Sequence, residues 1–293
     1  MKVFDRGSKK PRWTRLSGFM LNACLATACA TSMALFGYDQ GVFGGIIVTD
    51  SFLETMGNPD ANLQGTIVSL YDIGSSVLLS IFGKHHPNPL SGAVDGERFG
   101  RKKSLGIGVI IMSIGAILQA TAFTVAHIIV ARLFTGFGTG ITTATAPVWQ
   151  GETSKPDLRG KLVVLSTTAL VAGFSLSNWM TYGFSFLKGD VSWRFPIAFQ
   201  LVFSIILLIT IPWLPESPRW LIAHERDREG AEVLAAFQGD GSTFDSPNIV
   251  AQKMEILEAV NIEREQSLSW LKILKGQTGN TGMVKRLLLG MGE

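Results

Sequence analysis

The 293-residue chain contains few cysteines and little charge, and each shortage excludes certain classes of protein. Its two cysteines, Cys24 and Cys29, lie in one apolar run, where they are typical of packing residues and exclude a disulfide scaffold. A net charge of +3 is too small to indicate a nucleic-acid partner. The sequence also lacks a nucleophile–base set, a metal-ligand cluster and a phosphate-binding loop, so we expect neither an enzyme nor a cofactor.

Charge is missing altogether from five long, mostly apolar stretches. Most of them have the roughly 20 residues that cross a bilayer as a helix, which excludes a soluble single domain. We therefore expect an all-α membrane protein in which residues 17–214 form a bundle of six transmembrane helices within a lipid bilayer. The charge-free stretches are 16–38, 104–131, 133–151, 162–187 and 195–215. The expected helices lie near 17–48, 63–83, 104–126, 127–150, 161–187 and 193–214.

Basic residues indicate how these helices are oriented. Lys and Arg crowd the N-terminal tail, 1–16, and the loop 98–103, whereas the connection after the first helix carries only acids. Because basic loops stay in the cytosol, we expect a cytosolic N-terminus and, after an even number of spans, a cytosolic region at 215–282. That region is polar and helix-patterned, which predicts surface helices beneath the bundle.

Glycines recur at one-turn spacing inside two of the expected helices. Gly37, Gly41 and Gly45 share one face of the first helix, and Gly136 and Gly140 share one face of the fourth. Small residues at this spacing let two helix backbones approach closely in lipid. A nucleotide-binding glycine loop needs a strand before it and a helix starting after it, so we favour helix packing.

Two charges, Asp39 and Arg132, are expected deep inside the membrane, where a charge costs on the order of 2.5–3.5 kcal/mol on insertion scales. Asp39 lies about nine residues from the outer end of its helix, and Arg132 about five residues from the outer end of its own. At ~1.5 Å per residue both fall in the outer half, so the depths allow a salt bridge. The pair is either a static ion pair or a carboxylate that binds and releases a proton. For Asp72 we expect a structural or interface role.

Five short motifs fall at the expected cytosolic helix ends or within the membrane. They are Gly96-Glu97-Arg98-Phe99-Gly100-Arg101-Lys102, Arg132 followed by Gly136, Gly138 and Gly140, Pro147-Val148-Trp149-Gln150-Gly151-Glu152, Glu152 followed by Arg159-Gly160, and Pro215-Glu216-Ser217-Pro218-Arg219-Trp220-Leu221. Each alone is weak support, but their order along one chain is highly specific. With these motifs the sequence resembles the sugar porter family of the major facilitator superfamily, especially its fungal members, over about 17–293.

This resemblance implies the N-terminal half of a major facilitator fold, because members carry two six-helix halves that rock about a central substrate site. Two features depart from the family. The run at 283–293 corresponds to the start of helix 7, where the chain stops, so we expect a truncated product. Members also continue helix 2 through apolar residues, whereas 84–94 here is interrupted by polar residues and prolines. We expect a gene-model error there, with no metal site at His85 and His86.

The resemblance also assigns roles to the charged residues. Asp39 matches the acid that carries the proton in proton-coupled members, and Arg132 matches its basic partner. Charge-assisted hydrogen bonds at the cytosolic rim hold helix ends together while the path is open to the outside. The expected cytosolic gate consists of Glu97, Arg98, Arg101, Glu152, Arg159, Glu216 and Arg219.

The expected substrate site also departs from the family pattern. Hexose-binding members commonly place a Gln in helix 5, and some place a second Gln seven residues later. These positions are Thr167 and Phe174 here. Because Thr offers one hydroxyl and Phe only stacking, a smaller or less polar polyol such as glycerol becomes an alternative to a hexose.

The resemblance therefore implies a plasma-membrane symporter that carries a sugar or polyol together with protons by alternating access. Two alternatives stay open at this point. One is a nutrient sensor of the same fold, and the other is an inactive half-transporter fragment.

Overall fold

The structure, a computed structural model, describes residues 18–82, 99–154, 156–239 and 241–266. These residues form helices and the turns between them, and no strand occurs within these ranges. In chain order the elements are α1 (Gly18–Ile46), α2 (Asp50–Thr55), α3 (Ala61–Phe82), α5 (Arg101–Ala120), α6 (Val125–Thr153), α7 (Pro156–Ser185), α8 (Val191–Thr210), η3 (Ile211–Trp213), α9 (Pro218–Ala223), α10 (Asp227–Gln238) and α11 (Pro247–Gln266).

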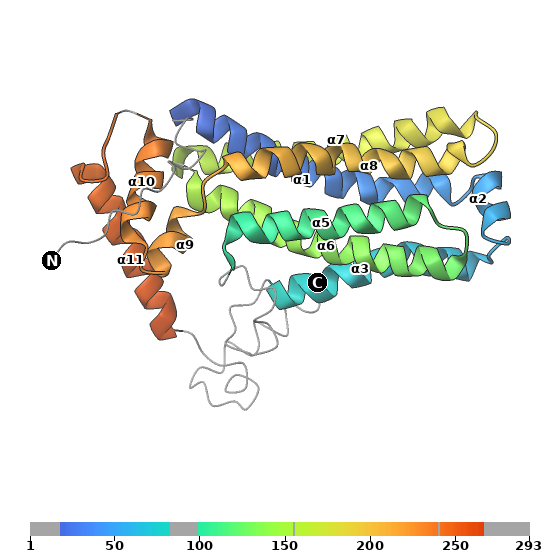
Figure 1. Ribbon diagram of the computed structural model, residues 1–293, viewed down its shortest axis with the longest axis horizontal. Coiled ribbons are helices and arrows are strands. Elements are labelled where there is room, and N and C mark those ends of the chain that lie inside the picture. Colours follow the sequence, from blue (N-terminus) through green and yellow to red (C-terminus); the bar gives the residue numbers. More distant parts are fainter. Residues whose placement is uncertain (1–17, 83–98, 155, 240, 267–293) are drawn as a thin grey trace.

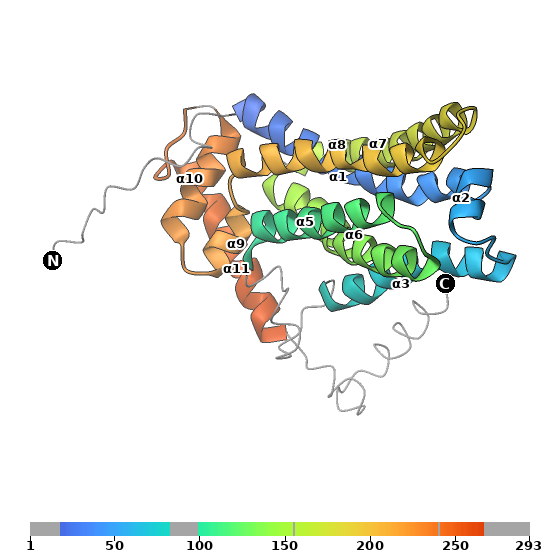
Figure 2. The same cartoon turned by 45° about the vertical axis from the view of Figure 1, so that its right-hand side comes forward.

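The helices α1, α3, α5, α6, α7 and α8 lie side by side along the long axis of the molecule (Figures 1 and 2). Within this bundle α1 packs chiefly on α7, α3 on α6, and α5 on both α6 and α8. The all-α fold expected from the sequence is confirmed.

Five helices of the bundle are long and apolar enough to cross a membrane, as judged over the described residues. Their membrane-length segments are Gly18–Ile46, Arg101–Ala120, Val125–Thr153, Leu158–Ser185 and Val191–Trp213. The helix α3 is not among these five, but it occupies the place of the expected second span beside α6. Composition therefore supports five spans, and position in the bundle supports the sixth.

Glycines stand where two pairs of helices come closest. A Cβ atom at Gly37 of α1 would lie 2.0 Å from the carbonyl oxygen of Leu170 in α7. A Cβ atom at Gly136 of α6 would lie 2.5 Å from the carbonyl oxygen of Tyr71 in α3. Both distances are far inside van der Waals contact, so larger residues would push the helices apart. Helix packing is confirmed, and a nucleotide-binding loop is excluded because these glycines lie inside helices.

The short helices that follow α8 are fixed to one end of the bundle (Figure 1). One hydrophobic cluster joins Leu21 of α1 and Trp149 of α6 to Leu221 of α9 and Phe237 of α10. The side-chain amide of Asn22 also donates a hydrogen bond to the carbonyl oxygen of Phe237, at 3.0 Å. The helices expected beneath the bundle therefore occur where α1 begins and α6 ends.

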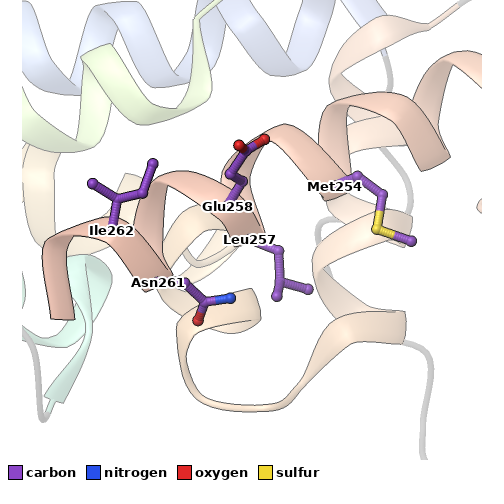
Figure 3. A pocket seen from close by; sticks show the side chains of 5 residues that line it. All are labelled: Met254, Leu257, Glu258, Asn261 and Ile262. Carbon is purple, nitrogen blue, oxygen red and sulfur yellow. The ribbon is translucent and has the colours of Figure 1, made fainter. Parts of the chain in front are cut away.

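The last described helix, α11, packs on α9 and α10. An open pocket runs along it, and Figure 3 shows the five lining side chains, Met254, Leu257, Glu258, Asn261 and Ile262. All five come from this one helix. The pocket is therefore a feature of the helix surface and lies apart from the charged sites of the bundle.

Candidate functional site

Two of the charges expected at the cytosolic rim form an ion pair where α5 begins. Arg101 of α5 contacts Glu152 of α6 through two bonds, Nε to Oε2 at 3.1 Å and Nη2 to Oε1 at 2.9 Å. Their side chains are only 16% and 10% exposed. Paired N–H···O bonds between planar charged groups are among the strongest polar contacts in proteins, so this pair ties α5 to α6.

Glu216, which follows α8 and η3, binds the same helix start. Its Oε1 accepts hydrogen bonds from the backbone N–H groups of Arg101 at 2.6 Å, Lys102 at 3.0 Å and Ser217 at 3.0 Å. The first turn of a helix leaves its N–H donors without partners inside the helix. It is also the positive end of the helix dipole, which attracts a carboxylate. Glu216 therefore caps α5 from a distant part of the chain.

Burial and hydrogen bonding act in opposite directions on the Glu216 carboxyl. Burial raises its pKa above the ordinary value of 4.5, and hydrogen bonds from the backbone of Lys102, Ser217 and Arg101 lower it less strongly. The net pKa is therefore raised. Gly100 makes room for the carboxylate: its φ is +85°, and a Cβ atom there would lie 2.3 Å from Oε2 of Glu216. Both the backbone conformation and the space favour glycine.

Lys102 provides a second connection between α5 and the end of α8. Its Nζ donates hydrogen bonds to the carbonyl oxygens of Pro212 at 3.0 Å and Leu214 at 2.6 Å. These are carbonyl groups at the end of a helical segment, which carry partial negative charge. Sequence reasoning missed this role, although Lys102 belongs to the same basic motif as Arg101.

Of the other expected gate residues, the structure describes Arg159 and Arg219. Arg159 is exposed on α7 and forms no ion pair among the described residues. Arg219 is half-buried in α9. Glu97 and Arg98 lie outside the described residues. The structure thus brings Arg101, Glu152 and Glu216 together, and the shared gate role of the full set remains a prediction.

Inside the bundle, Asp39 of α1 and Arg132 of α6 face each other. Arg132 Nη1 lies 3.6 Å from Asp39 Oδ1, and the side chains are 1% and 0% exposed, respectively. This distance is within ion-pair range but too long for a hydrogen bond. Over the described part of the chain, neither Asp39 oxygen nor Nη1 of Arg132 forms a hydrogen bond. The two charges therefore attract each other electrostatically, but no direct hydrogen bond fixes their relative position.

The rest of the Arg132 guanidinium is held by other groups. Its Nε and Nη2 donate hydrogen bonds to the carbonyl oxygens of Ile67 and Val68 in α3, each at 3.3 Å. The guanidinium carbon also lies 4.0 Å from the ring centre of Phe43 and 4.5 Å from that of Tyr71. Cation–π contacts of this kind strengthen when water is excluded. Arg132 is therefore anchored to α3 independently of Asp39.

The sequence analysis did not predict the two aromatic rings that contact Arg132, although the sequence contains a signal for one of them, Phe43. Phe43 stands one helical turn after Asp39, so it faces the same neighbour. Tyr71 has no comparable signal, because its contact depends on how α3 is rotated against α6. The Tyr71 hydroxyl donates a hydrogen bond to Thr139 Oγ1 at 3.2 Å, which fixes the ring between the two helices.

The candidate substrate residues Thr167 and Phe174 lie on one exposed face of α7. Thr167 is exposed, and Phe174 is 44% exposed while its ring edge packs against Gly41 of α1. Farther along α7, Asn178, Trp179 and Tyr182 line an open pocket. Both candidate residues are therefore accessible beside the α1–α7 contact, and their role in substrate binding remains a prediction.

A bundle of membrane-length helices with a buried ion pair and charged links between helix ends has the architecture of a multi-pass membrane transporter. Comparison with known proteins identifies the family. The profile of the family described as "Sugar (and other) transporter" matches residues 24–292, and the chain belongs to this family. The resemblance seen in the sequence motifs is thereby confirmed, as is the expectation that the chain is not an enzyme.

Particular relatives extend this result. The chain is 44% identical over 296 residues to the MFS-type transporter oryC of Aspergillus oryzae, covering 100% of this chain and 52% of the relative. It is 32% identical over 277 residues to the Sugar transporter STL1 of Saccharomyces cerevisiae, covering 89% and 46%. The chain spans about half the length of the curated relatives it matches.

A solved structure shares the fold. The proton:xylose symporter XylE from E. coli matches 84% of this chain and 54% of its own, with a TM-score of 0.72 and 21% sequence identity. At this identity the likeness shows the major facilitator fold alone. The expected fold, the N-terminal part of a major facilitator protein, is confirmed.

Proposed function

We propose that this chain takes part in proton-coupled symport of a sugar or polyol by alternating access. The observation that carries the proposal is the Asp39–Arg132 pair, which is almost fully buried yet lacks a direct hydrogen bond. Ionisable groups inside a membrane protein are costly and mark ion or proton pathways by default. Family membership supports transport, and the buried pair supports the proton coupling.

Proton exchange at Asp39 changes how α1 is held. An ionised Asp39 attracts the guanidinium of Arg132 across the contact between α1 and α6. A protonated Asp39 is neutral, so this attraction falls, while Arg132 stays on α3 through its backbone and ring contacts. The proton therefore alters one helix contact without releasing the arginine. This is the kind of two-state element that couples proton binding to a conformational change.

The charged network around the start of α5 forms the second part of the proposal. Arg101–Glu152 and the Glu216 cap hold the ends of α5, α6 and α8 together, and their release would let the cytosolic side open. In this arrangement the N-terminus is cytosolic and the membrane is the plasma membrane. Charge-assisted bonds suit such a gate because they are strong when formed and well solvated when broken.

The side chains of α7 favour a small or weakly polar substrate. Thr167 and Phe174 offer one hydroxyl and one ring face, which satisfy fewer sugar hydroxyls than two amide side chains would. STL1 is named a sugar transporter, and XylE is named a proton:xylose symporter. From these α7 side chains we infer that a small polyol such as glycerol is an alternative substrate to a hexose.

Uptake by the complete coding sequence, read from the transcript through codons 79–95 and past 293, tests this proposal. Proteoliposomes should accumulate the substrate above equilibrium only when an inward proton gradient is imposed. Asp39→Asn should abolish this accumulation while sparing downhill exchange. Glu54→Gln, which removes an exposed acid in α2, is the matched control. Unchanged pH dependence in Asp39→Asn would refute the proton assignment, and binding without uptake would indicate a sensor.

A further inference from the structure

A third charge in the bundle, Asp72 of α3, is not used by the proposed mechanism. Asp72 is exposed on the surface of α3, eleven residues after Ala61 begins this helix. A carboxylate at such a position is costly against lipid, so it faces protein or water. Among the described residues it takes part in no ion pair, so a structural salt bridge does not account for it.

The position of Asp72 relates it to Arg132. Asp72 stands one helical turn after Val68, so the two share a face of α3. Arg132 Nη2 donates to the carbonyl oxygen of Val68 in a partly buried bond, whereas its Nε bond to Ile67 is fully buried. The Nη2 side of the guanidinium therefore lies nearer than Nε to the helix surface that carries Asp72. The ring of Tyr71, the residue next to Asp72, covers the same guanidinium.

Arg132 also has an unused donor. Its Nη1 makes no hydrogen bond among the described residues and contacts Asp39 only at 3.6 Å. The titratable groups nearest to Arg132 are Asp39 on α1, 3.6 Å from Nη1, and Tyr71 on α3, whose ring centre lies 4.5 Å from the guanidinium carbon. Asp72 directly follows Tyr71 on α3. Arg132 thus contacts a buried acid, Asp39, and also the part of α3, at Val68, that shares a face with the exposed acid Asp72.

We propose that Asp72 is the second counter-ion of Arg132, and that it balances the guanidinium whenever Asp39 carries a proton. Asp72 is then a positioning residue that acts through Arg132. With Asp39 and Asp72 both ionised, the three groups carry one net negative charge, and protonation of Asp39 brings them to neutrality. Without Asp72, the same protonation would leave a buried site with one net positive charge. Asp72 therefore makes proton uptake by Asp39 easier.

A double-mutant cycle tests this inference without relying on transport. Thermal unfolding is measured for the complete, detergent-solubilised protein and for Asp39→Asn, Asp72→Asn and the double variant. In each single variant the remaining acid still balances the charge of Arg132, whereas the double variant has no acid beside it. The double variant should therefore unfold at a lower temperature than the sum of the single shifts predicts. A parallel cycle of Asp39→Asn with Glu54→Gln should be additive. Additivity in the Asp72 cycle overturns the proposal, and so does failure of Asp72→Asn alone to fold.

The pH profile of uptake provides the second readout, which rests on the proposed function. Asp72→Asn should shift the pH of half-maximal proton-driven uptake by roughly one unit towards acid, since a nearby negative charge is lost. Asp72→Glu should restore the original profile, and Glu54→Gln should leave it unchanged. A wild-type profile in Asp72→Asn overturns the inference. Absence of proton-driven uptake in the wild type instead refutes the proposed function, while the unfolding cycle still tests the charge pairing.

Discussion

The two charged sites of the molecule differ in how tightly their partners are bound. At the start of α5, Glu216 and Glu152 accept hydrogen bonds of 2.6–3.1 Å from Arg101 and its neighbour. Inside the bundle, Asp39 and Arg132 are more deeply buried but stand 3.6 Å apart without a hydrogen bond. The more buried pair is therefore the less tightly bonded one.

This difference suits two different tasks. A carboxylate with several short hydrogen bonds holds helix ends in one arrangement, because each bond favours its ionised form. A buried carboxylate with a single distant cation keeps its electrostatic attraction but has few bonds to break when it changes its charge. We therefore expect the α5 network to hold the helix ends together and the Asp39–Arg132 pair to change its interaction when Asp39 binds a proton.

The largest effect is expected for Arg132→Ala, which leaves Asp39 buried without a counter-ion inside the bundle. Breaking a buried pair by removing one partner costs about 3–5 kcal/mol. Unfolding of the purified protein in detergent should therefore occur at a much lower temperature. Arg228→Ala is the control, because Arg228 pairs with Glu232 at an exposed position where about 0–1 kcal/mol is expected. Equal shifts for both variants would show that burial does not decide the strength of the pair.

The next largest effect is expected for Glu216→Ala, which removes the cap from α5. Loss of a side-chain cap costs about 0.5–2 kcal/mol, and here the N–H groups of Arg101 and Lys102 both lose their acceptor. Hydrogen exchange should increase in the first turn of α5 while the middle of α3 stays protected. If exchange rises equally in both places, Glu216 supports the whole bundle and is not a local cap.

The sequence predicted the partners at each site better than it predicted their surroundings. Helix depth placed Asp39 and Arg132 in one layer, and the motif order placed Arg101, Glu152 and Glu216 at one rim, because both depend only on distance along helices. The ring of Tyr71 and the carbonyl of Val68 depend on how α3 is rotated about its axis. A single sequence does not define that rotation.

The same limit applies to Arg159, which is exposed near the start of α7 and whose gate role stays a prediction. Its place along the helix was derived from the family motif, whereas the direction of its side chain follows from the packing of α7 on α1. The glycine seam between these two helices shows that packing clearly, since Gly37, Gly41 and Gly45 all face α7. Positions along a helix were thus predictable, and directions around it were predictable only where small residues marked the contact.

A smaller effect is expected for Glu152→Gln, which keeps the shape of the side chain but removes its charge. The pair with Arg101 is partly exposed, so the loss should be roughly 1 kcal/mol. If the pair belongs to the cytosolic gate, exchange of substrate from the cytosolic side should become faster in this variant. Glu232→Gln, at an exposed helix pair, should change neither quantity. An unchanged exchange rate with lowered stability would restrict the pair to a structural role.

The smallest effect concerns the pH dependence of Glu216. Because burial raises the pKa of Glu216 in the folded protein above 4.5, the folded state takes up this proton more readily than the unfolded state. Its contribution to stability is therefore complete below 4.5 and is lost as the pH rises through the folded-state pKa. Glu216→Gln has no such titration, so wild type should lose stability relative to this variant as the pH rises above 4.5 and through the folded-state pKa. The melting-temperature difference between the two proteins over this range tests the sign. A wild type that instead gains stability relative to the variant would mean that the hydrogen bonds to the carboxylate outweigh its burial, and the α5 cap would then hold more tightly than the comparison of the two sites assumes.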